Sequence, residues 1–148
     1  MPAHSPKKGA ASVPSLILEL RNEDPRVRER ASRELYGLAP MAQMAIPALI
    51  DALHDPNPFV RQWVATTLER MALHFGPLLK KAVPGLTELL KDEDFKVREW
   101  AAHALGAIGA HAVSAIPALQ EALEDNDSSV IEAATSALQA IEKSRCLL

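Results

Sequence analysis

The chain has 148 residues and a net charge of −3, and 48% of its residues are hydrophobic although only 4% are aromatic. This length and composition predict one compact helical domain, and the acidic balance argues against a strongly basic nucleic-acid binder. The single cysteine, Cys146, excludes an internal disulfide framework and favours a reducing compartment.

The first eleven residues are polar and lack hydrophobic periodicity, so we expect residues 1–11 to form a disordered leader. Lys7 and Lys8 precede a short apolar run, but Pro14 interrupts this run and Glu19 ends it. A signal peptide is therefore not predicted, and we expect a cytoplasmic protein.

The rest of the chain repeats one helix–turn–helix unit. Four prolines mark the first helices at intervals of 33, 37 and 33 residues: Pro14, Pro47, Pro84 and Pro117. Apolar landmarks of the second helices keep the same register: Val27, Val60, Val97 and Val130, then Leu35, Leu68, Leu105 and Leu138. The predicted repeats span about residues 12–43, 44–80, 81–114 and 115–143, followed by a tail over 144–148. Self-similarity at this period is typical of a solenoid, in which each helix pair buries its apolar faces against its neighbours.

Repeats one and two carry clear signals for the start of their second helices. In repeat one, NEDPR supplies Asp24 as an N-cap and Pro25 at the first helical position, and in repeat two Asn57 and Pro58 play the same parts. The exit of repeat two, LHFGPLLKK, contains the four extra residues that lengthen the spacing to 37. Four residues are about one helical turn, so the insertion lengthens either a helix or a loop.

Repeat three contains the clearest second helix, VREWAAHALGAIG. Its apolar stripe is Val97, Ala101, Leu105 and Ile108, and Asp94 precedes it as a predicted N-cap. The run from Trp100 to Gln120 has no Asp, Glu, Lys or Arg, but the repeat register divides it into a helix, a loop and a second helix. A membrane-spanning segment is therefore not predicted.

These units resemble the HEAT-like repeats first recognised in phycobilisome lyases, as AIPALIDALHDPNPFVRQWVATTLERMA and AVPGLTELLKDEDFKVREWAAHALGAIG illustrate. The resemblance implies an all-α, right-handed α-solenoid of four helix pairs, with the second helices lining a concave groove. It also implies that Asp55, Arg61, Asp92 and Arg98 form a polar ladder between neighbouring turns, so we interpret these arginines as structural. Repeat one departs from the pattern with Asn22 beside Arg28, and repeat four departs with Asp125 beside Ile131.

We expect the groove to be formed by positions of the second helices that lie off the buried stripe. Aromatic and arginine side chains often anchor protein interfaces, and Trp63 and Trp100 occupy the same position one repeat apart. The predicted partner-binding residues are Trp63, Trp100, Phe59, Phe95, Arg30, Arg33, Gln62, Thr66, Arg70, Glu99 and His103. The alternative that both tryptophans fill the space between adjacent helices stays open.

The resulting hypothesis is a non-catalytic protein-binding module or scaffold. No activated nucleophile or phosphate-binding loop is recognisable, and no catalytic residue, metal or cofactor is predicted. One HEAT-repeat class, deoxyhypusine hydroxylase, holds two irons with His-Glu pairs, but this chain contains no His-Glu dipeptide. Two alternatives remain, a nucleic-acid-binding solenoid, which mixed charge along the groove disfavours, and a self-assembly module. The sequence does not identify the partner or the oligomeric state.

Overall fold

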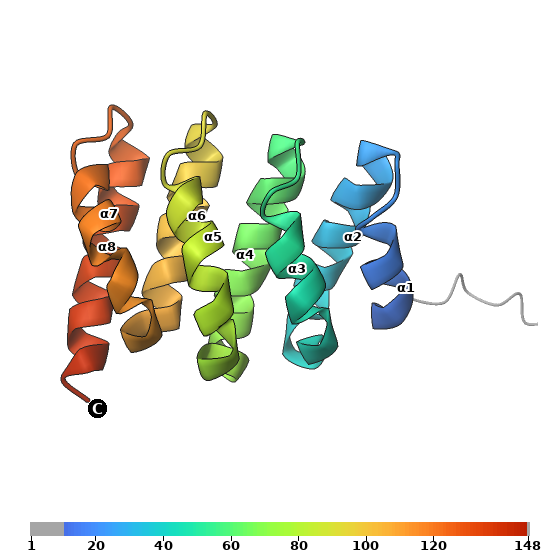
Figure 1. The fold of residues 1–148 in the computed structure, drawn as a ribbon, viewed down its shortest axis with the longest axis horizontal. Coiled ribbons are helices and arrows are strands. Elements are labelled where there is room, and N and C mark those ends of the chain that lie inside the picture. The colour runs from blue at the N-terminus through green and yellow to red at the C-terminus, as the bar shows by residue number, and fades with distance from the viewer. Residues whose placement is uncertain (1–10, 148) are drawn as a thin grey trace, which may run out of the picture.

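The computed structural model describes residues 11–147, which form eight α-helices arranged as four pairs in a row (Figure 1). The first helices are α1 (Val13–Glu19), α3 (Ile46–Ala52), α5 (Val83–Leu89) and α7 (Ile116–Ala122). The second helices are α2 (Pro25–Gly37), α4 (Pro58–Phe75), α6 (Phe95–Ile108) and α8 (Ser128–Arg145). This arrangement confirms the predicted all-α solenoid, whereas the predicted leader lies almost wholly in residues 1–10, outside the described range.

Each second helix begins at a side chain that accepts a hydrogen bond from an amide of the first turn. The distances from amide nitrogen to cap oxygen are 2.9 Å at Asp24, 2.8 Å at Asn57, 2.8 Å at Asp94 and 2.9 Å at Asp127. Such caps satisfy amides that have no carbonyl partner within the helix. The three caps expected from the sequence are confirmed, and Asp127 is a fourth.

Segments of 3-10 helix connect one repeat to the next along the lower edge of Figure 1: η1 (Ala39–Met41), η2 (Gln43–Ala45), η3 (Gly76–Ala82) and η4 (Gly109–Ala115). Small residues anchor these segments in the core, because Ala42, Ala45, Ala82, Ala112 and Ala115 are all fully buried. The insertion in repeat two lengthens a helix, since α4 has 18 residues whereas α2 has 13 and α6 has 14.

The apolar stripes form one continuous core through the stack. Val97, Ala101 and Leu105 are fully buried on α6, as the spacing predicts. Val27 of the first repeat and Leu138 of the last are only half-buried, in contrast to their equivalents in the inner repeats. A terminal repeat has a neighbour on one side only, which accounts for this difference.

The two layers of helices pack differently. The second helices contact one another directly along the stack, α2 with α4, α4 with α6 and α6 with α8. Within residues 11–147 the first helices have no comparable contacts with one another and touch mainly their own second helix and a 3-10 segment. The second helices therefore form one continuous, directly packed layer.

The turns within the repeats, along the upper edge of Figure 1, are joined by a ladder of three ion pairs. Each arginine Nε lies close to a carboxylate of the next repeat, at 2.7 Å for Arg28–Asp55, 2.8 Å for Arg61–Asp92 and 2.9 Å for Arg98–Asp125. A second nitrogen of each guanidinium donates to the other carboxylate oxygen, which makes every pair bidentate. The ladder expected of Asp55, Arg61, Asp92 and Arg98 is confirmed, and its arginines join neighbouring repeats. Arg28 and Asp125, from the two repeats that depart from the pattern, complete it.

One stretch, Phe95–Ala122, is long and apolar enough to cross a membrane when judged by length and composition alone. In the fold this stretch comprises α6, η4 and α7, and the chain leaves α6 at Gly109, whose φ is 69°. Gly109 is the one described residue with positive φ, a conformation that glycine adopts without a steric penalty. The stretch is therefore not one straight helix.

Candidate partner-binding groove

The candidate site is the outward face of α2, α4 and α6, on the side opposite to the first helices that face the viewer in Figure 1. Because these three helices pack directly against one another, their outward side chains project from a rigid layer. We call this surface the groove and define it by the eleven predicted residues together with Tyr36 and Glu69.

An aromatic and cationic cluster joins α2 to α4. The Tyr36 and Trp63 rings meet edge to face, with centroids 5.8 Å apart and an interplanar angle of 62°. The Arg70 guanidinium lies 4.7 Å from the centroid of the Tyr36 ring and also donates a hydrogen bond of 3.4 Å to the Tyr36 carbonyl. Aromatic pairs and cation–π contacts of this geometry restrain the side chains of the cluster.

A second cluster lies on α6. The Trp100 and His103 rings are tilted with centroids 5.1 Å apart, and Trp100 also packs against the buried core. Lys96 Nζ lies 5.4 Å from the Phe95 ring centroid and 3.3 Å from a Glu99 carboxylate oxygen. This cluster therefore combines apolar rings with both signs of charge.

The tryptophans were predicted either to face the groove or to fill the space between adjacent helices, and each alternative holds in part. Trp63 and Trp100 are each half-buried, so part of each ring lies against neighbouring residues and part faces solvent. The phenylalanines are more accessible, with 56% of Phe59 and 43% of Phe95 exposed. The exposed apolar area of the groove thus comes from Phe59 and Phe95 more than from the tryptophans.

The polar residues predicted for the groove differ in what they offer a partner. Arg33 is exposed, and the exposed Arg30 lies 3.5 Å from Glu19 and 3.9 Å from Glu34. Gln62 is half-buried, whereas Thr66 is only 8% exposed and its hydroxyl donates to the Gln62 carbonyl at 2.8 Å. Thr66 therefore presents almost no surface, because its hydroxyl turns back to the preceding helical turn.

Sequence reasoning missed two groove residues, Tyr36 and Glu69. Both occupy the tenth position counted from the landmark valine. The residues predicted on α4, which are Gln62, Trp63, Thr66 and Arg70, occupy the third, fourth, seventh and eleventh positions. In a helix the third, seventh and tenth positions are spaced by four and three residues and lie on one face. A prediction based on this spacing would have included Tyr36 and Glu69.

The carboxyl of Glu69, on the groove, has a shifted pKa. Burial raises the pKa of its carboxyl above the ordinary value, and the nearby His103 partly opposes this effect. A carboxylate that has lost water and lacks a full counter-charge would gain from a cation supplied by a partner. Within residues 11–147, no three His, Cys, Asp or Glu side chains are placed to hold a metal ion.

Comparison with known proteins agrees with the repeat architecture. The family of HEAT repeats matches residues 13–77 and 72–139, which together cover most of the chain. No curated protein sequence matches.

Three solved structures illustrate the likeness of fold. An engineered protein is 27% identical with a TM-score of 0.75, and the match covers 89% of this chain and 63% of that one. The complex of CpcE and CpcF of phycocyanin lyase from Nostoc sp. PCC7120 matches at 26% identity and a TM-score of 0.58, over 97% of this chain and 69% of that one. A designed armadillo repeat protein in complex with the peptide (KR)4 matches at 19% identity and a TM-score of 0.77, over 87% of this chain and 64% of that one. The chain thus spans less than two thirds of the engineered and armadillo proteins.

Proposed function

The chain belongs to the family of HEAT repeats, and on that premise we propose that it is a non-catalytic module that binds a peptide or helix of a partner protein in the groove. The observation that carries this proposal is the Tyr36–Trp63–Arg70 cluster, which is held in place by its own contacts. Exposed Phe59 lies on the same helix as Trp63 and Arg70, and exposed Phe95 lies on α6. Aromatic and arginine side chains that are already ordered lose little conformational entropy on binding.

The charges of the groove favour a protein over a nucleic acid. Lys96 is paired with Glu99, Arg30 lies near Glu19, and the half-buried Glu69 disfavours a neighbouring phosphate. A partner segment with apolar side chains and at least one lysine or arginine would complement Phe59, Phe95 and Glu69. The (KR)4 complex of the designed armadillo protein shows that a solenoid of this fold accommodates a peptide, and this likeness concerns the fold alone.

Affinity capture from a nuclease-treated lysate of the source organism tests the proposal. The bait is the wild-type chain, compared with the Trp63→Ser/Trp100→Ser variant and with Phe59→Ser/Phe95→Ser, whose side chains are exposed enough that the fold should persist. Leu18→Ser on α1 is the matched control, because Leu18 is 74% exposed on the opposite layer. Circular dichroism verifies that each variant is folded.

A protein retained by wild type and Leu18→Ser, and lost by both aromatic variants, supports groove binding and identifies the partner. Retention of the same proteins by every variant would exclude the aromatic residues as anchors and defeat the proposal. If the chain captures partners only when nuclease is omitted, and if this binding depends strongly on salt concentration, the result would support a nucleic-acid-binding solenoid instead.

A further inference from the structure

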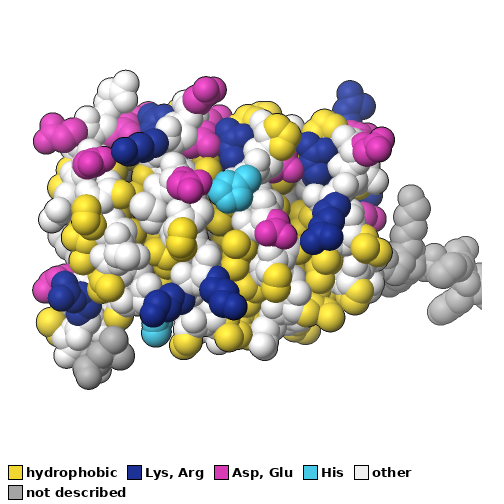
Figure 2. Space-filling view, viewed as in Figure 1, with side chains coloured by type: hydrophobic (Ala, Val, Ile, Leu, Met, Phe, Trp, Pro, Cys, Tyr) yellow, Lys and Arg dark blue, Asp and Glu magenta, His cyan; other side chains and the backbone are white. Residues whose placement is uncertain are grey.

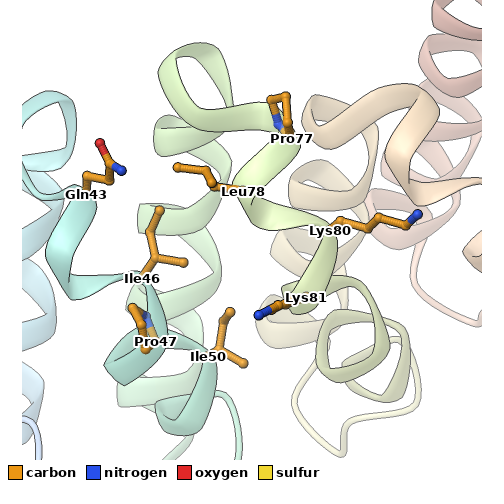
Figure 3. A pocket seen from close by; sticks show the side chains of 8 residues that line it. All are labelled: Gln43, Ile46, Pro47, Ile50, Pro77, Leu78, Lys80 and Lys81. Carbon is orange, nitrogen blue, oxygen red and sulfur yellow. The ribbon is translucent and has the colours of Figure 1, made fainter.

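A pocket of about 680 Å³ lies outside the groove, between α3 and η3 (Figure 3). Its residues come from the end of one inter-repeat connection, the following first helix, and the next connection. They are Gln43, Ile46, Pro47, Ile50, Pro77, Leu78, Lys80 and Lys81. Since α3 is a first helix, the pocket belongs to the opposite layer from the groove.

The pocket occurs where repeat two departs from its neighbours. Because α4 has an extra turn at its C-terminal end, η3 begins only at Gly76, and it passes beside α3. Leu79 and Ala82 are fully buried and fix η3 to the core. Pro77 and Leu78, which come just before them in the chain, are exposed. Pro77 and Leu78 thus form an exposed apolar wall of the pocket, together with Ile46 and Ile50 of α3.

The lining is apolar with a cation at one end. Figure 3 shows the side chains of Ile46, Ile50 and Leu78 around the space, with Lys81 extending toward Ile50. Lys80 extends from the same segment in another direction. A ligand in this space would contact hydrocarbon along most of its length and an ammonium group at one end.

The ammonium groups of Lys80 and Lys81 form no ion pair within the described residues 11–147. The lysine ion pairs of that range involve Lys91 and Lys96 instead. The acid nearest to the pocket in sequence, Asp51, lies 3.8 Å from Arg21, beside repeat one. Charge complementarity therefore favours an acidic occupant.

The apolar surface extends beyond the pocket. Met41 is 74% exposed, Met44 is 61% exposed, and both belong to the same connection as the pocket residue Gln43. In Figure 2, charged side chains gather along the upper edge, and hydrophobic side chains extend to the lower edge, where these connections lie. Flexible, exposed methionine side chains on the connection that also contributes Gln43 to the pocket suit a protein segment, since a ligand confined to the pocket would leave Met41 and Met44 uncovered.

We propose that the α3–η3 pocket binds an acidic amphipathic segment of a partner protein. The apolar side chains of the segment would enter between Ile50 and Leu78, and its carboxylates would pair with Lys81, whose side chain extends toward Ile50 (Figure 3). A second copy of the chain is a poorer occupant, because a symmetric contact through this surface would bury the lysines of both copies with no acid among the pocket residues to pair with them.

Selection from a phage-displayed library of random peptides of roughly 12 residues, about three helical turns, tests this proposal. Enriched peptides are synthesised with a fluorescent label and titrated by anisotropy against wild type, Lys81→Glu and Leu78→Ser. Both substitutions fall on exposed residues, so the fold should persist. Lys143→Glu is the matched charge control on α8, and Phe59→Ser/Phe95→Ser removes the groove anchors.

We expect enriched peptides that combine Asp or Glu with apolar residues at helical spacing. Their affinity should fall at least about tenfold with Lys81→Glu and with Leu78→Ser, and change little with Lys143→Glu or the groove variant. Peptides that are mainly basic, or that lose affinity only with the groove variant, would overturn the pocket proposal without affecting the proposed function. Concentration-dependent dimerisation of the wild type that Leu78→Ser abolishes would assign the surface to a second copy and also overturn it.

Discussion

Asp92→Ala tests whether the ladder stabilises the solenoid. Asp92 accepts hydrogen bonds from Arg61 Nε at 2.8 Å and Nη2 at 3.0 Å, and from the Asp94 amide at 3.0 Å. The exposed fractions of the Asp92 and Arg61 side chains are 8% and 16%. The substitution therefore leaves a largely buried guanidinium without its carboxylate and an amide without its acceptor.

The expected loss follows from these contacts. Removing one partner of a buried ion pair costs about 3–5 kcal/mol in the free energy of unfolding. Arg61 keeps some solvent access and its 2.7 Å hydrogen bond to the Asp55 carbonyl, which lowers this part to about 2 kcal/mol. The unpaired Asp94 amide adds about 1 kcal/mol, so the total is about 3 kcal/mol. At about 3 °C per kcal/mol for a chain of this size, the melting temperature should fall by about 10 °C.

Urea unfolding followed by circular dichroism at 222 nm measures this loss. Asp51→Ala is the matched control, because Asp51 lies 3.8 Å from Arg21 with both side chains more than 70% exposed, and it should cost less than about 1 kcal/mol. Arg61→Met/Asp92→Ala removes the unpaired charge and should be more stable than Asp92→Ala alone. Equal losses for Asp92→Ala and Asp51→Ala, or a double variant less stable than the single one, would refute the reasoning.

Three further predictions concern other parts of the fold. Because burial raises the pKa of Glu69, its ionised form costs stability above that pKa, so Glu69→Gln should increase the free energy of unfolding at pH 7. In urea titrations this gain should fade as the pH falls toward the ordinary glutamate value of about 4.3, and a gain independent of pH would contradict the assignment. A Cβ on Gly106 would lie 2.9 Å from the Ala137 Cα, so Gly106→Ala should lose about 1–3 kcal/mol despite its helix propensity, whereas Gly37→Ala, with no atom within 4 Å, should lose none. Asn57→Ala removes the cap of α4 and should lower the free energy of unfolding by about 1 kcal/mol, and an unchanged urea midpoint would mean that the cap contributes nothing.

The repeat register was sufficient to predict most of the fold. The caps Asp24, Asn57 and Asp94 and the buried stripe of α6 depend on local spacing, which a sequence displays directly. The Arg–Asp pairs were predicted from the resemblance, because their partners lie about one repeat apart in sequence and no local pattern joins them.

The candidate site was less accessible to sequence reasoning. Burial on a second helix depends on how far each repeat rotates against the next, and the sequence period does not specify this rotation. Thr66 is therefore buried although its position is one expected to face the groove, and Tyr36 reaches Trp63 and Arg70 from a neighbouring helix. The sequence also did not show whether the insertion lengthens a helix or a loop, because LHFGPLLKK contains both helix-forming residues and a Gly-Pro step.

Repeat two contributes to both proposed sites, α4 to the groove and α3 with η3 to the pocket, and it is also the repeat that carries the insertion. An extra turn at this place could have displaced every later repeat. The ladder shows that it did not, because the Arg–Asp distances of 2.7, 2.8 and 2.9 Å stay nearly constant along the stack. The insertion lies at the C-terminal end of α4, whereas Arg61 lies at the N-terminal end of the same helix. Since each repeat contacts only its neighbours, one edge of the solenoid maintains the register while the other edge can change its surface.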